Sequence, residues 1–234
     1  MDIIYNIHPG NGQSLGMEVR LEDHEKLYML HSEMIIAFQG ASHQREDRIM
    51  DLKGMVRKKK WLRSDLSGPC RFVLSLPAGY SVRSIPVKDQ EDFLFDVRHV
   101  LFYTSGVQMK SVIQRMKNVV VTRDWVRMKF FGEGEIGILS QGPLVEMKLS
   151  EDEPIYIDAG CLVAYPQNAK LDLCVYGNQL AGQHMNYHWK ITGQGYVLMQ
   201  TGKPGLRLEE HLQDDGLIKR LLREIIPFGG VFIK

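Results

Sequence analysis

The sequence lacks several features that would assign it quickly to a class. Its three cysteines are odd in number and have no CxxC spacing, which argues against both a disulfide framework and a zinc knuckle. No stretch approaches about eighteen consecutive apolar residues, and residues 1–6 hold no basic segment followed by an apolar one, so we expect neither a membrane span nor export. Reduced thiols then favour a cytoplasmic protein.

Strong net charge and catalytic signatures are missing too. The formal net charge is +1, so the chain as a whole is not a dedicated nucleic-acid binder. Neither GxSxG, nor a cysteine with a recognisable base, nor the EF-hand spacing is present. Acidic clusters around Asp23, Asp89 and Asp152 recur at similar turns, where backbone geometry selects such residues. We therefore expect a protein that is not an enzyme and has no cofactor and no metal ion.

What the chain does contain is a recurring block. The octet DVRHVLFY at 96–103 reappears as DAGCLVAY at 158–165, and more faintly as HSEMIIAF at 31–38. Self-similarity at a nearly fixed interval is typical of architectures in which each unit covers the apolar face of its neighbour. The sequence predicts a single domain over 1–234, built from three repeats at approximately 1–83, 84–146 and 147–204, with a helical tail over 205–234.

Strand patterns dominate the repeats. Alternation over 185–191, 125–130 and 169–175 predicts half-buried strands. Glycine turns at 132–134 and 193–195, with a looser counterpart at 67–69, predict hairpins.

Two segments depart from this pattern. Residues 107–113 fit either a strand or a helical stripe, and the repeat favours the strand. Asp214 or Asp215 can cap a helix whose apolar face ends before Pro227. The predicted fold class is all-β, with three repeated β-sandwich units and a short C-terminal helix.

Two motifs have plain structural interpretations. Residues 132–137 spell GxGxxG, but a short strand follows in place of the helix that a dinucleotide needs, so we interpret the motif as a turn. His184 and His188 have the spacing of zinc ligands on a helix. On a strand their side chains lie about 13 Å apart, too far to share one ion.

The strongest polar feature is basic. Residues 45–63 contain eight basic and three acidic residues, a local net charge of +5. This segment could bind RNA or another polyanion, and Trp61 could stack on a base or lie at a lipid interface. The alternative is a solvated edge strand whose charges prevent sheet-to-sheet pairing. A second basic stretch includes Arg127 and Lys129. The candidate polyanion-binding residues are Arg57, Lys58, Lys59, Lys60, Trp61 and Arg63.

Together, the 158–165 octet, the strand from Ala169 and the 185–201 segment with its glycine turn resemble the altered-inheritance-of-mitochondria type 24 family. Bacterial members carry a triplicated domain of unknown function. The resemblance spans nearly the whole chain and implies a β-sandwich fold similar to the trp RNA-binding attenuation protein, with three units around a pseudo-threefold axis. The family has no established enzymatic residues. Here the basic segment 45–63 replaces the glycine-rich stretch that members often carry in the first repeat.

Three functions remain open at this point. The first is a non-enzymatic β scaffold that presents surfaces to an unknown protein partner or self-associates through exposed strand edges. The second is RNA or polyanion binding through residues Arg57–Arg63, and the third is a small-molecule sensor or enzyme with a cleft between repeats.

Overall fold

The computed structural model describes residues 2–4, 15–50, 61–87, 92–113, 126–177 and 187–202. These residues are nearly all β, in several antiparallel sheets, and their only helices are three-residue 3₁₀ turns. The coarse all-β prediction is therefore confirmed. The predicted C-terminal helix lies outside the described residues.

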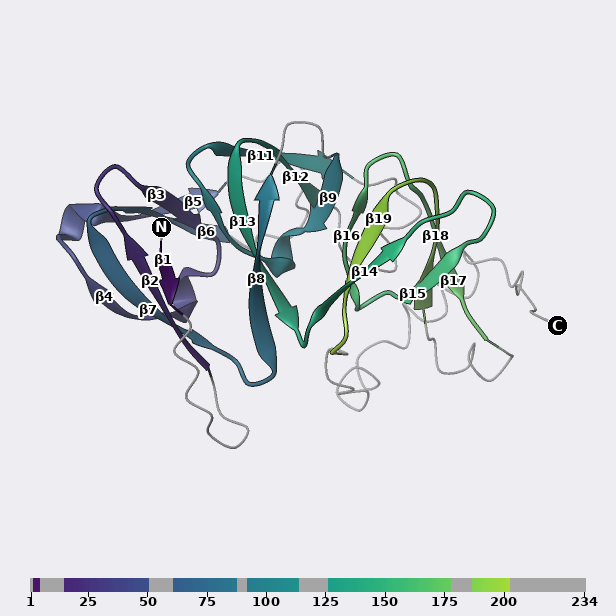
Figure 1. The fold of residues 1–234 in the computed structure, drawn as a ribbon, viewed down its shortest axis with the longest axis horizontal. Helices are drawn as coiled ribbons and strands as arrows, with labels where there is room; N and C mark the ends of the chain where they lie inside the picture. The colour runs from purple at the N-terminus through teal and green to yellow at the C-terminus, as the bar shows by residue number, and fades with distance from the viewer. Residues whose placement is uncertain are drawn as a thin grey trace.

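We divide the strands into three groups that follow one another along the longest axis of the molecule (Figure 1). The first group contains β2 (Leu15–Leu21), β3 (Lys26–Met29), β4 (Ile35–Gln39), β5 (Arg45–Met50), β6 (Trp61–Ser67) and β7 (Cys70–Leu76), with β1 (Asp2–Ile4) added to β2. The second contains β8 (Tyr80–Val87), β9 (Phe93–Asp96), β10 (Val100–Thr104), β11 (Val107–Ile113), β12 (Val126–Gly132) and β13 (Gly134–Gln141). The third contains β14 (Leu144–Lys148), β15 (Ile155–Asp158), β16 (Leu162–Pro166), β17 (Lys170–Val175), β18 (Tyr187–Thr192) and β19 (Tyr196–Gln200).

Four sheets connect these groups, and two of them cross from one group into the next. Sheet A has the order β1-β2-β7-β4, and sheet D the order β15-β18-β17. Sheet B runs β5-β6-β3-β10-β13-β8, so the β3–β10 pair joins the first group to the second. Sheet C runs β11-β12-β9-β16-β19-β14, so the β9–β16 pair joins the second group to the third. Paired strands therefore join each described group to its neighbour, in addition to the connecting chain.

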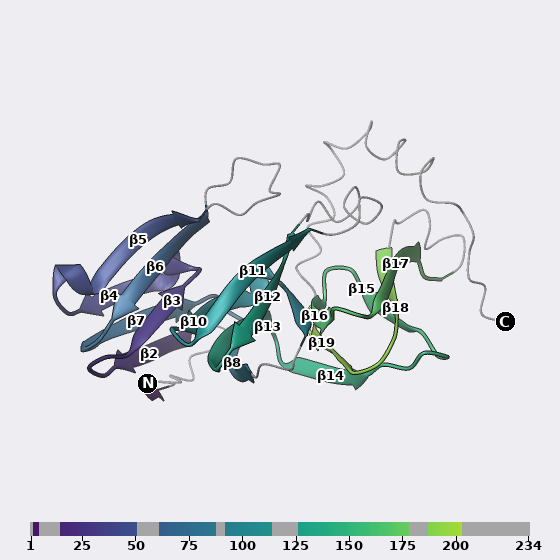
Figure 2. The ribbon, with the colours of Figure 1, turned by 90° about the horizontal axis from the view of Figure 1, so that it is seen from above.

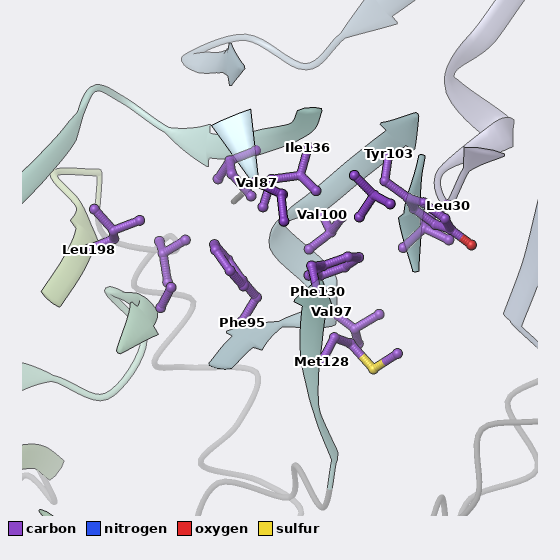
Figure 3. Close-up of a cluster of buried hydrophobic side chains, with 14 residues drawn as sticks. Leu30, Val87, Phe95, Val97, Val100, Tyr103, Met128, Phe130, Ile136 and Leu198 are labelled. Carbon is purple, nitrogen blue, oxygen red and sulfur yellow. The ribbon is translucent and has the colours of Figure 1, made fainter. Parts of the chain in front are cut away.

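Apolar side chains fill the space between successive sheets in three clusters. The first cluster lies between sheets A and B and includes Met17 and Phe72. The last lies between sheets C and D and includes Trp189. The middle cluster lies between sheets B and C, with Leu30 of the first group and Leu198 of the third at its opposite sides (Figure 3). All three groups therefore contribute side chains to the middle cluster.

The joining strands β10 and β16 are buried almost throughout, whereas burial alternates along a strand such as β7. Both faces of these two strands are covered, which explains why their sequences are continuous apolar runs. Each has a β-bulge at the same place, opposite the last strand of its own group. Leu101 and Val163 occupy the bulges. Leu101 packs in the first cluster, with side chains of the first group, and Val163 packs in the middle cluster, with side chains of the second group. The bulge thus directs one side chain across each junction.

The glycine turns predicted as hairpins are turns, but the strands on either side do not pair. Gly132 and Gly134 have positive φ angles, as the tight reversal requires. However, β12 pairs with β9 and β11 in sheet C, while β13 pairs with β8 and β10 in sheet B. The turns at 193–195 and 67–69 likewise connect strands of facing sheets. The hairpin prediction was wrong because a glycine turn fixes the reversal and not the sheet that the next strand joins.

Candidate functional site

The described part of the basic segment forms β5 and β6 at one edge of sheet B. On these strands acidic side chains alternate with the basic ones. Arg45 lies 3.3 Å from Asp47, and Arg48 lies 2.7 Å from Glu46. Asp47 also accepts a hydrogen bond from Ser64, which is the main reason that its pKa is lowered. The surface of these two strands is therefore close to neutral.

Arg63 is the one candidate polyanion-binding residue whose side chain the structure describes. Its guanidinium donates two hydrogen bonds to Asp65, at 2.6 and 3.0 Å, and a third to the hydroxyl of Tyr103 at 3.0 Å. The same guanidinium lies 4.7 Å from the centre of the Tyr28 ring, in a cation–π contact. Arg63 thus holds β6 against β3 and β10, and an external anion would have to displace these contacts.

The other candidates cannot be placed in the same way. Arg57, Lys58, Lys59 and Lys60 lie outside the described residues, and Trp61 is placed only as the first residue of β6. The excess positive charge of the segment therefore belongs to residues 51–60, between the ends of β5 and β6.

An exposed apolar pair lies at the same ends of these strands. Ile49 and Leu62 face each other across the β5–β6 ladder, and they are 60% and 49% exposed. Apolar side chains on an otherwise charged edge are typical of a contact surface for another protein. The charge in the sequence indicated this region, but the apolar pair depends on the strand register and was not predicted.

A buried charge cluster lies at the end of β9. Asp96 and Arg127 are 2% and 3% exposed, and their side chains form an ion pair of 2.6 Å between β9 and β12. Arg98 adds a second ion pair of 2.6 Å. Burial opposes ionisation of Asp96, but the positive charges of Arg127 and Arg98 outweigh it and hold its pKa well below the ordinary value. Arg127, predicted only as part of a basic stretch, is therefore an internal ion-pair partner.

His99 lies beside this cluster, with Nδ1 3.0 Å from the carbonyl oxygen of Leu139. Burial lowers the pKa of His99, and the charge of Asp96 opposes the shift without cancelling it. A carboxylate held by two guanidinium groups is a poor proton acceptor, so this cluster suits structural support better than acid–base catalysis.

A cavity of about 310 Å³ lies between β8 of sheet B and the β14–β19 end of sheet C. Four aromatic rings and several aliphatic side chains line it. Arg83 of β8 and Glu146 of β14, which also line the cavity, form an ion pair of 2.9 Å. A mainly apolar cavity with a few polar groups, at the low end of the usual size range, is typical of a small-molecule site. The aromatic lining residues are Phe93, Phe95, Phe130 and Tyr196.

The remaining motifs form no site in the described residues. The GxGxxG residues lie in the β12–β13 turn and in β13, where no helix follows. A Cβ at Gly137 would overlap the ring of Phe102, which explains that glycine by packing. His188 lies in β18, whereas His184 lies outside the described residues. Within the described ranges, no three His, Cys, Asp or Glu side chains are placed to hold a metal ion.

The model of a family described as Mitochondrial biogenesis AIM24 matches residues 11–202. The chain belongs to this family. The match includes every strand from β2 to β19 and confirms the resemblance drawn from the octet and the 185–201 segment. The AIM24 chain has no match among the curated proteins.

The fold of this AIM24 chain is similar to that of a crystal structure of a protein from Streptococcus pyogenes. The two superpose with a TM-score of 0.61 at 16% sequence identity, over 94% of this chain and 100% of that chain. At this identity the likeness concerns the fold alone. In the portion that the structure describes, no helix has the length and apolar character needed to cross a membrane.

Proposed function

We propose that this AIM24 chain is a non-enzymatic β scaffold, built from three repeated sandwich units, that presents surfaces to a partner. The single observation that carries the proposal is that a continuous sheet crosses each junction, sheet B the first and sheet C the second. Continuous sheets fix the spacing and orientation of the units, which a scaffold needs and a set of linked domains lacks.

The repeat itself is supported by the strand pairing. In each group the first, sixth and third strands are neighbours, as are the second, fifth and fourth. On this basis the units begin near Tyr80 and Leu144, whereas the boundaries predicted from the octets, 84 and 147, fall inside β8 and β14. The pseudo-threefold axis implied by the family resemblance stays a prediction, as does a cytoplasmic location.

The Ile49–Leu62 pair is the surface that we propose for a protein partner. It is apolar and exposed, and the basic residues 51–60 lie between its two members in the sequence, which suits a partner with an apolar contact bordered by acidic groups. The immobilised full chain should retain a protein from native lysate, and the double variant Ile49→Asp with Leu62→Asp should lose it. Val145→Asp, at an exposed apolar residue of β14, is the matched control and should retain it. Equal retention by all three proteins would contradict the assigned surface.

A second candidate function is small-molecule binding in the cavity beside β8, supported by its aromatic lining. An apolar fluorescent probe should bind the wild-type chain and bind about tenfold more weakly to Leu198→Trp, which fills the space. Unchanged binding by this variant would place the probe elsewhere.

The polyanion alternative depends on residues Arg57–Arg63, of which Arg63 is held by Asp65 and Tyr103. Its signature is affinity for RNA that falls steeply as salt rises. A filter-binding titration without retention at low salt would exclude it.

A further inference from the structure

The first and third groups each end in a strand that corresponds to one of the strands paired at the internal junctions. Strand β4 of the first group holds the same position in its group as β10 and β16, which pair with the group before. Strand β15 of the third group holds the same position as β3 and β9, which pair with the group after. Among the described strands, β4 and β15 are outermost in their sheets. The chain thus ends in one edge of each kind.

The bulge of β4 makes this correspondence specific. Its register against β7 shifts between Ile35 and Ala37, as the registers of β10 and β16 shift around Leu101 and Val163. The bulged residue is Ile36. Leu101 and Val163 are 0% and 1% exposed because the preceding group covers them, whereas Ile36 is 65% exposed.

The charge pattern of the edges supports the same conclusion. Edge strands avoid unwanted pairing by carrying charged residues or proline. Strand β5 has four charged residues among six, and β8 carries Arg83 and Pro86. In contrast, β4 reads IIAFQ and has no charge and no proline, while β15 reads IYID with only its last residue charged. These two edges therefore lack the protection that β5 and β8 have.

We propose that copies of this chain associate head to tail, with β15 of one copy pairing antiparallel with β4 of the next. This inference rests on the scaffold function proposed above and names a second copy of the chain as one of its partners. The ends of one chain do not meet, because β4 and β15 lie at opposite ends of the molecule (Figures 1 and 2). Sheets D and A of successive copies would then form one continuous sheet.

The internal junctions give the register of this contact. In the β3–β10 pair Met29 is opposite Phe102, and in the β9–β16 pair Phe95 is opposite Ala164. By the same rule, Ile157 of one copy is opposite Ala37 of the next, and Ile155 is opposite Gln39. Ile36 would enter the last cluster beside Ile157, as Leu101 enters the first cluster beside Met29. Because the two edges differ, the contact closes into a ring or continues as a filament.

Complementation between two edge variants tests the proposal. Ile36→Asp blocks the β4 edge, and Tyr156→Asp, at a half-buried residue of β15, blocks the other. Sedimentation velocity of the full chain should show assemblies for the wild type and monomers for either variant alone. An equal mixture of the two variants should form dimers, because each supplies the edge that the other lacks. A wild type that stays monomeric at about 100 µM, or assemblies that survive Ile36→Asp, would overturn the proposal.

Disulfide trapping tests the register and does not require that a charged variant folds. In a Cys174→Ser background, Gln39→Cys with Ile155→Cys should give crosslinked chains under mild oxidation. The matched control, Gln39→Cys with Tyr156→Cys, moves one thiol to the opposite face of the sheet and should give none. Ile49→Asp, at a similarly exposed isoleucine, should assemble like the wild type. If the wild-type chain is monomeric but still retains a protein from lysate, the head-to-tail contact is wrong and the scaffold function stands.

Discussion

The second group of strands and the two outer groups have the same order of pairing but differ in what covers them. In the second group, β9 and β10 each pair with a strand of a neighbouring group, and Leu101 is fully buried. In the first group, Ile36 occupies the corresponding bulge and is exposed. The difference lies in the neighbour and not in the strand itself. The side chain at the bulge is thus buried where a preceding group covers it and exposed where none does.

The largest expected difference in stability is between variants of Asp96 and Asp158, which occupy the same place in the octets of the second and third groups. Asp96→Asn removes the negative charge that lies 2.6 Å from the buried Arg127 and should lower the free energy of unfolding by about 3–5 kcal/mol. Asp158 is half-buried and accepts a hydrogen bond from the backbone N–H of Gly160, which asparagine can also accept. Asp158→Asn should therefore change stability by less than about 1 kcal/mol. Chemical denaturation that gave both variants similar losses would contradict the internal role of the Asp96 pair.

The second effect compares Leu101 with Ile36 directly. Leu101→Ala removes side-chain volume from a filled junction and should cost about 2–5 kcal/mol. Ile36→Ala, measured at a concentration low enough for chains to be monomers, should cost less than about 1 kcal/mol. Thermal melts of the two variants side by side would make the measurement. Equal shifts in Tm would mean that the junction does not cover Leu101 as described.

The smallest effect is a pH dependence from His99. Its pKa is lowered in the folded chain, so below an unfolded value of about 6.5 the unfolded chain binds the proton first. Stability should therefore fall as the pH drops from about 6.5, by at most roughly 1.4 kcal/mol per pH unit for this one group. His99→Gln should flatten that part of the curve. Asp96, with its lowered pKa, contributes stability that is lost only below about pH 4, so the two contributions separate.

The sequence predicted most of the local structure. Alternation predicted strands over 125–130, 169–175 and 185–191, and strands are found at 126–132, 170–175 and 187–192. The repeat favoured the strand over the helix for 107–113, where β11 lies. The continuous apolar runs in the octets correspond to strands covered on both faces. These features depend on neighbours in sequence or on a period, which a single sequence contains.

What the sequence could not supply depends on register and on distant neighbours. Nothing in the periodicity places Arg127 opposite Asp96, and a basic stretch is the natural interpretation of its surroundings. The cavity lies between β8 and β14, which approach only because sheets B and C face each other. The Ile49–Leu62 pair likewise depends on how β5 and β6 align.

Native-state hydrogen exchange at the two junctions is the most direct test of the claim that three strand groups form one rigid body. The amides of β10 and β16, together with the Leu30 amide that donates to the Leu101 carbonyl, report on the junctions. The shared sheets predict that these amides exchange only through global unfolding, with opening free energies within about 1 kcal/mol of the most protected amides in β7. If the junction amides exchange with a much lower opening free energy while the other amides of each group stay protected, the groups are three independent units and the account is contradicted.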